Sequence, residues 1–104
     1  MTGAAREMAD RWAPACDEYL ENFEHGFYDE SNILQLILPA DKTTVEAERG
    51  DLVIGHAGVD GIYFCFREGK TGVYAYYGIE DEHVLVAPSI RELIQKWTDG
   101  SLTL

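Results

Sequence analysis

The chain has 104 residues, which suits one domain with one hydrophobic core, and we expect a single domain over residues 1–104. Hydrophobic residues make up 46% and aromatic residues 12% of the chain, which excludes a disordered polypeptide. Nineteen acidic residues against eight basic ones give a formal net charge of −11. Such a field repels nucleic-acid phosphates and anionic lipids, so we expect neither as a partner. It attracts a basic partner, or it serves solubility alone.

The start of the chain and its cysteines indicate a cytoplasmic protein. The first ten residues, MTGAAREMAD, contain no apolar signal-peptide core, and no apolar run reaches the roughly 20 residues of a membrane span. Cys16 and Cys65 lie far apart without metal-ligand spacing. We interpret them as reduced, partly buried thiols, with a single disulfide as the alternative.

The N-terminal region has the periodicity of a helix. Apolar side chains recur there at three- and four-residue spacings, at Met8, Trp12, Cys16, Tyr19, Leu20 and Phe23. Pro14 interrupts this pattern, and proline suits the first turn of a helix better than its interior. We therefore predict a helix that begins near Pro14, with a short or kinked helix before it.

The remainder of the chain predicts strands followed by one more helix. NILQLIL, at 32–38, indicates a strand that Pro39 stops. After Asp51, short β-rich runs at 52–56, 62–67, 72–77 and 83–87 are separated by turn residues. Connections this short favour antiparallel neighbours, and hence a meander.

The C-terminal segment predicts a further helix. Ser89 followed by Glu92 forms a capping box, and Gly100 is a suitable stop. The apolar stripe between them consists of Ile90, Leu93, Ile94 and Trp97. The predicted fold is therefore α+β, with a central, mainly antiparallel sheet, an N-terminal helix or helices, and a C-terminal helix packed on it.

The segment IGHAGVDGIYFCF, at 54–66, contains a glycine-rich loop. A phosphate-binding loop needs its glycines to lead from a strand into a helix, whereas both flanks here are strand-like. Gly58 and Gly61 instead permit the positive φ angles of a tight hairpin, and Asp60 can cap the turn. We interpret the loop as a turn and predict no cofactor there.

Two pairs of residues are candidates for catalysis or metal binding, with simple turns as the alternative. If His56 pairs near Gly61, Cys65 lies opposite Leu52, about 13 Å from His56, which is too far for a Cys–His dyad. Asp81 and His83 could share a strand face and hold a metal. A lone pair without a second ligand cluster is more typical of a charged turn. We therefore predict no catalytic residue, no metal and no enzymatic activity.

Assumed strand registers divide the strand residues between two faces of the sheet, and both faces are too apolar to be fully exposed to solvent. Phe66 is placed opposite Val73, and Val84 opposite Tyr77. The first face contains Ile62, Phe64, Phe66, Val73, Ala75, Tyr77, Val84 and Val86. The second face contains Leu52, Ile54, Tyr63, Cys65, Tyr74, Tyr76, Leu85 and Ala87.

The tyrosines of the second face are candidates for a protein-binding surface. Tyrosine offers a large contact area with a polar tip and is enriched at interfaces. Our hypothesis is that Tyr63, Tyr74 and Tyr76 mark a partly open surface that binds another protein or a second copy. The alternative is that a terminal helix covers them, and full burial of all three rings would end the hypothesis.

The C-terminal half contains LVIGHAGVDGIYFCF, GVYAYY, an acidic turn and VLVAPSIRELIQKW in this order. In these segments, which cover residues 51–99, the chain resembles the SUKH superfamily, and WAPACDEYL at 12–20 is similar to the early helix of the family. The matching positions are Ile54, Gly55, Gly58, Tyr74, Glu80 to Glu82, Ala87, Ser89 and Leu93. The resemblance implies an α+β fold and protein binding without catalysis. Bacterial members are regarded as immunity proteins that neutralise toxins, often nucleases, and fungal relatives regulate cell-wall synthesis.

The resemblance and the acidic charge together predict a protein-binding module that neutralises a basic toxin. The predicted contact residues are Tyr63, Tyr74, Tyr76, Glu80, Asp81 and Glu82. Two alternatives remain at this stage: a homodimeric structural or regulatory domain that uses the open sheet face, and a small-molecule-binding domain with a pocket between elements.

Overall fold

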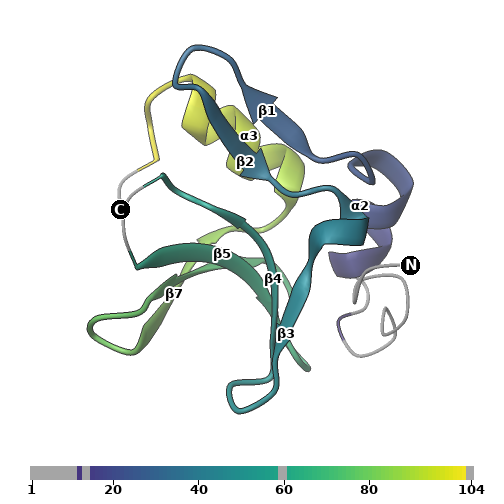
Figure 1. Cartoon of the computed structure of the whole chain (residues 1–104), viewed down its shortest axis with the longest axis vertical. Coiled ribbons are helices and arrows are strands. Elements are labelled where there is room, and N and C mark those ends of the chain that lie inside the picture. Colours follow the sequence, from purple (N-terminus) through teal and green to yellow (C-terminus); the bar gives the residue numbers. More distant parts are fainter. Residues whose placement is uncertain (1–11, 13–14, 59–60, 103–104) are drawn as a thin grey trace.

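The computed structural model describes residue 12 and residues 15–58 and 61–102. Within them the chain forms a mainly antiparallel seven-stranded sheet with one α-helix before it and one after it. Figure 1 shows how these elements are arranged. The predicted α+β class is confirmed. The strands are β1 (Phe27–Asp29), β2 (Leu34–Ile37), β3 (Thr44–Glu46), β4 (Asp51–His56), β5 (Ile62–Arg67), β6 (Val73–Tyr77) and β7 (Glu82–Ala87). The helices are α2 (Ala15–Asn22), the short 3₁₀ helix η2 (Ala40–Lys42) and α3 (Ile90–Thr98).

The strand order is β1-β2-β4-β5-β6-β7, and β3 pairs with β4. The predicted meander is therefore the run from β4 to β7. The sequence did not predict β1 and β3, because three residues are too few to show a two-residue period. The predicted helix before Pro14 and the predicted cap by Asp60 lie outside the described residues.

Helices α2 and α3 both begin where the local sequence predicts. α2 starts one residue after Pro14. The Ser89 side chain accepts a hydrogen bond from the backbone N–H of Glu92 at 3.2 Å, which confirms the predicted cap of α3. Glu18 of α2 also accepts a hydrogen bond from the backbone N–H of Ile90 at 3.0 Å. This bond joins the two helices and satisfies a free donor at the start of α3.

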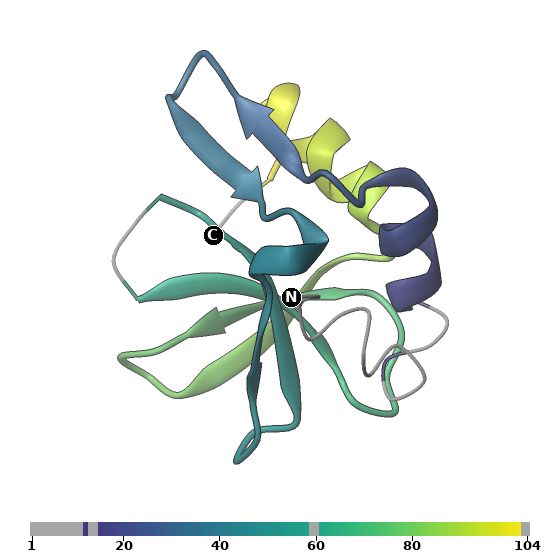
Figure 2. The ribbon, with the colours of Figure 1, turned by 45° about the vertical axis from the view of Figure 1, so that its right-hand side comes forward.

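The two helices pack on the same face of the sheet, which we call the helix-covered face. Tyr19 of α2 meets Phe66 edge-on with ring centroids 6.1 Å apart, and Trp97 of α3 meets Phe64 at 6.5 Å. Trp97 also donates to the Asp29 carboxylate at 2.6 Å, so α3 lies beside the β1–β2 hairpin (Figure 2). The hydrophobic core therefore lies between the helices and this face.

The observed register between β4 and β5 differs from the assumed one, and it changes which residues of β4 lie on each face. A bulge between Val53 and Gly55 shifts the pairing, so that Cys65 lies opposite Val53 rather than Leu52. Because side chains alternate along a strand, this one-residue slip turns Leu52 and Ile54 to the helix-covered face, where both are fully buried. Their predicted place on the second face was wrong.

The predicted register of β6 is right against β5 and wrong against β7. Phe64 lies opposite Ala75, as predicted. On the other side Ala75 faces Val84 rather than Val86, a two-residue offset that keeps Val84 on its predicted face. A second irregularity brings Ala87 opposite Val73, so Ala87 belongs to the core and not to the second face.

Glycines allow two tight features next to the sheet. Gly58 and Gly61 have φ angles of +77° and +81°, which confirms the prediction that they serve turn geometry. Gly55 allows the backbones of β2 and β4 to approach closely, since a Cβ atom there would lie 2.0 Å from the Leu36 carbonyl oxygen. The second of these features was not predicted.

Candidate functional site

A buried ionic network lies on the sheet face that faces away from α2 and α3, which we call the opposite face. Its centre is Asp51, the first residue of β4, whose side chain is fully buried. Arg49 Nε donates to Asp51 Oδ2 at 3.0 Å, and His83 Nε2 lies 2.6 Å from the same oxygen. Arg67 Nε lies 3.4 Å from Asp51 Oδ1. The buried carboxylate is thus compensated by two guanidinium groups and an imidazole.

The curvature of the sheet brings these side chains together. Asp51 belongs to β4 and His83 to β7, with β5 and β6 between them in the strand order. Direct contact between them requires the sheet to curl around the opposite face, and β5 bends strongly in Figure 1. The bulge in β4 supplies part of this curvature, since bulges increase local twist.

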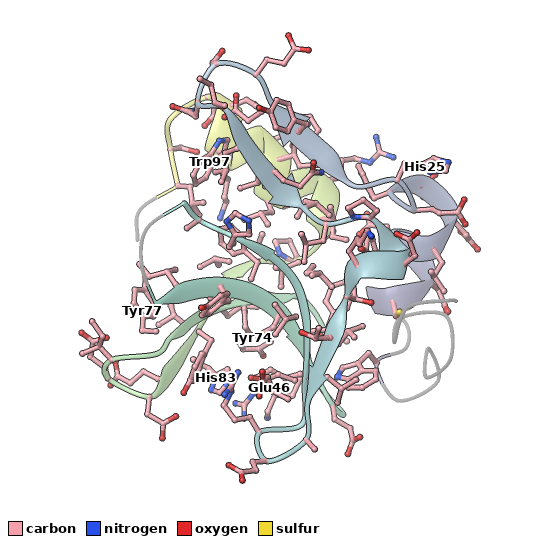
Figure 3. All side chains as sticks on the ribbon, viewed as in Figure 1. His25, Glu46, Tyr74, Tyr77, His83 and Trp97 are labelled. Carbon is pink, nitrogen blue, oxygen red and sulfur yellow. The ribbon has the colours of Figure 1, made fainter. Side chains whose placement is uncertain are left out.

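The network continues into the turn between β6 and β7. The Arg49 guanidinium stacks 3.9 Å from the centre of the Tyr76 ring, which lies 4.8 Å from the His83 ring. The Tyr76 hydroxyl donates to Asp81 Oδ1 at 2.7 Å, and this bond raises the pKa of Tyr76. Arg49 Nη1 also lies 3.9 Å from Glu46 Oε2, and Figure 3 labels both Glu46 and His83. The β3–β4 turn and the β6–β7 turn are therefore tied to one another.

Cys65 lies under this network. Its side chain is fully buried, and its sulfur lies within 4.8 Å of ligand atoms of Asp51 and His83. Burial, with a smaller contribution from the negative charge of Asp51, raises the pKa of the thiol to about 12. Cys65 is therefore a neutral thiol at physiological pH. Without exposure or thiolate character it does not have the properties of a catalytic nucleophile.

The histidine that meets Cys65 is not the one considered from the sequence. His56 lies opposite Tyr63 in the β4–β5 pairing, whereas His83 comes from β7. The suggested pair of Asp81 and His83 is also divided, because Asp81 binds Tyr76 while His83 contacts Asp51. One signal could have pointed to the network: charged residues within apolar strands need partners when they are buried.

The six predicted contact residues differ in exposure, and the three tyrosines are the less exposed ones. The Tyr63 side chain is 42% exposed, Tyr74 is half-buried, and Tyr76 is buried beneath Arg49. The condition that would have ended the tyrosine hypothesis, burial of all three rings, is therefore not met. The acidic residues Glu80, Asp81 and Glu82 are all exposed at the tip of the β6–β7 hairpin.

Large apolar side chains accompany these acidic residues. Ile79 is 86% exposed, Leu85 57% and Val84 44%. Six residues of this hairpin with exposed charged or large apolar side chains form what we call the hairpin patch: Ile79, Glu80, Asp81, Glu82, Val84 and Leu85. It combines negative charge with apolar surface on a strand at the edge of the sheet.

A cavity of about 310 Å³ lies beside the turn between β4 and β5. It is lined by Asn32, Ile33, Leu34, Ala57, Gly58 and Trp97. Within the described part of the chain, its lining contains no ionisable side chain. A polar ligand would therefore find no charged partner among these residues, so the cavity gives the small-molecule alternative little support.

Comparisons of the chain with protein-family models, with curated proteins and with solved structures found no match. None of the helices formed by the described residues is long and apolar enough to cross a bilayer.

Proposed function

We propose that this chain is a non-catalytic, SUKH-type protein-binding module that neutralises a basic protein toxin. The observation that supports the proposal is the hairpin patch, in which Glu80, Asp81 and Glu82 lie between exposed Ile79 on one side and exposed Leu85 on the other. Acidic and apolar groups in one short segment suit a basic protein surface that also offers an apolar pocket.

Charge and apolar contact have separate roles in such binding. The net charge of −11 accelerates the approach of a basic partner, and the acidic turn orients it near the patch. Apolar side chains such as Ile79 and Leu85 lose their water when the partner arrives, which slows dissociation. The same charge opposes self-association, so it favours a basic partner over a second copy of this chain.

The ionic network supports the patch from below. Asp81 has a φ angle of +56°, a conformation that most residues avoid. Its side chain accepts the hydrogen bond from Tyr76, and Tyr76 is stacked under Arg49. A turn that is held before binding loses less conformational entropy when the partner docks.

We also place this function in the cytoplasm. The side chains of Cys16 and Cys65 are both buried thiols, and a reducing compartment keeps such thiols unoxidised. A toxin that acts inside the cell would be met there.

The test begins with affinity capture by the full chain from its source cell and identification of the partner by mass spectrometry. Association of the purified partner is then measured at several salt concentrations. Reversal of Glu80, Asp81 and Glu82 to lysine is expected to slow association by about tenfold or more and to reduce its salt dependence. Leu85→Ser is expected mainly to speed dissociation.

A matched control changes the net charge by the same amount elsewhere. Glu21, Glu30 and Asp41 are exposed and lie outside the hairpin, and their reversal to lysine should slow association less. Equal effects of the two triple variants would contradict a binding site at the hairpin. Capture of a second copy alone, with concentration-dependent dimerisation, would favour the homodimer instead.

A further inference from the structure

Three different strands bring a thiol, a carboxylate and an imidazole to one point. Asp51 of β4, Cys65 of β5 and His83 of β7 each offer one ligand atom, and these atoms lie within 4.8 Å of one another. Thiolate, carboxylate and imidazole are the ligands that Zn²⁺ takes in proteins. We propose that Asp51, Cys65 and His83 form a binding site for Zn²⁺ or a similar divalent transition metal.

The distances are close to those that a metal requires. Zinc bonds of about 2.0–2.3 Å place tetrahedral ligand atoms roughly 3.3–3.7 Å apart. The His83 Nε2 and Asp51 Oδ2 atoms are now 2.6 Å apart, and the sulfur of Cys65 completes a group no wider than 4.8 Å. Side-chain shifts on the order of 1 Å would give a three-ligand site with a fourth position for water.

A second observation concerns the carboxylate. Asp51 is fully buried, yet its Oδ1 atom has no hydrogen-bond partner. Arg67 Nε lies 3.4 Å from this oxygen and is itself without a hydrogen bond. A buried carboxylate oxygen without a hydrogen bond is rare and unfavourable. A bound metal would give this carboxylate a coordination bond in place of an incomplete ion pair.

The guanidinium groups of Arg49 and Arg67 compete with the metal for the Asp51 carboxylate, and the change in charge on metal binding measures this competition. The ion adds two positive charges, and the Cys65 thiol releases its proton to solvent as the metal–sulfur bond forms. The proton that His83 Nε2 donates to Asp51 Oδ2 moves to Nδ1, which frees Nε2 for the metal. The site therefore gains one positive charge. No electron is transferred in this step. The Arg49 side chain is 25% exposed and lies 3.9 Å from Glu46, so it can turn toward that carboxylate when the metal enters. Arg67 is similarly 29% exposed.

The test uses the reduced, metal-free full chain and adds Co²⁺ as a spectroscopic substitute for Zn²⁺. We expect one equivalent of cobalt to give a thiolate-to-cobalt charge-transfer band, and zinc to remove that band by displacing cobalt. Zinc should also raise the midpoint of thermal unfolding, because a ligand that binds only the folded state stabilises it. Toxin binding is not part of this assay, so its result is independent of the proposed function.

The variants separate this site from adventitious binding. Cys65→Ser and His83→Gln should weaken zinc binding by more than the roughly 10–100-fold that loss of an outer hydrogen-bond partner produces. The matched variants Cys16→Ser and His56→Gln should bind as the parent does. Arg49→Gln should tighten binding severalfold, since it removes a competing cation. Circular dichroism of each variant without metal checks that it is folded.

Two results would overturn the proposal. The first is a folded parent chain that gives no charge-transfer band with cobalt and no thermal shift with zinc. The second is metal binding that survives in folded Cys65→Ser, which would place the ion elsewhere on this acidic chain.

Discussion

The two faces of the sheet are stabilised in different ways, although the same strands form both. On the helix-covered face, apolar side chains such as Phe64 and Phe66 pack against the helices. On the opposite face, Asp51 is buried to the same degree but among charged partners. Apolar packing is spread over many contacts, whereas a buried charge depends on the few groups that compensate it.

In the part of the chain that the structure describes, neither α2 nor α3 covers the opposite face of the sheet. This contrast shows how a small chain can stabilise such a face without a helix. The opposite face is closed by curvature and by long side chains, with Arg49 stacked over Tyr76. Arginine suits this role because it covers a ring with its plane while its nitrogen atoms donate to a carboxylate.

The largest effect is expected on the helix-covered face. Phe66→Ala should lower the free energy of unfolding by about 3–5 kcal/mol, because it leaves a cavity beneath α2. Phe66 is 1% exposed and meets the Tyr19 ring. Chemical denaturation of this variant should be compared with Tyr63→Ala, a change on the same strand but on the opposite face. Equal losses would show that the helices do not define the main core.

The next effect tests the buried charge. Asp51→Asn keeps the shape of the side chain but leaves Arg49 and Arg67 without their carboxylate. We expect a loss of about 3 kcal/mol, since breaking a buried ion pair leaves uncompensated charge. The exposed Asp41→Asn variant is the control. A loss below about 1 kcal/mol for Asp51→Asn would mean that solvent compensates the arginines.

A third prediction concerns pH and the two thiols. Burial raises the pKa of Cys65 from 9.0 to about 12 and that of Cys16 to about 11. Because unfolded thiols lose their protons first, stability is full below pH 9 and falls as pH rises toward these folded values. Between pH 9 and 10 each thiol should contribute a loss of about 1 kcal/mol.

The measurement is the free energy of unfolding at pH 8, 9 and 10 under reducing conditions. Cys65→Ser and Cys16→Ser should each lose less stability over this interval than the parent. Cys65 reports on the opposite face, and Cys16 on the helix-covered face. If the free energy of unfolding of Cys65→Ser falls with pH as steeply as that of the parent, water reaches the Cys65 thiol on the opposite face.

The smallest effect tests the link between the network and the hairpin patch. Tyr76→Phe removes the hydrogen bond to Asp81 and should reduce stability by about 1 kcal/mol. Tyr63→Phe, on the same face but 42% exposed, should change stability by less than about 0.5 kcal/mol. Faster amide exchange in the β6–β7 turn of Tyr76→Phe would show that this bond holds the turn. Identical exchange would contradict that role.

The comparison also explains how much of the fold could be predicted. The strands from β4 to β7 and both helices were expected, because their signals are local: a two-residue period, a capping serine at Ser89 and turns at Gly58 and Gly61. The register of β4 could not be predicted in the same way. A single bulge near Val53 moved Leu52 and Ile54 to the other face, and a bulge has no reliable sequence pattern.

The candidate site was less predictable than the fold. The acidic turn at Glu80, Asp81 and Glu82 was singled out correctly as exposed, because charged residues next to a turn are solvated in most proteins. The partners of His83 were not found, since the sequence places Asp51 thirty-two residues away from it. Proximity of this kind depends on the curvature of four strands together.

The sequence by itself determined the class of fold, the acidic charge and the composition of the hairpin patch, since each depends on residue type and short-range spacing. Only the tertiary structure decided that Asp51, Cys65 and His83 lie together and that Arg49 covers Tyr76. The physical reason is that a strand pattern specifies alternation between two faces, while strand register and sheet curvature decide which residues meet on each face.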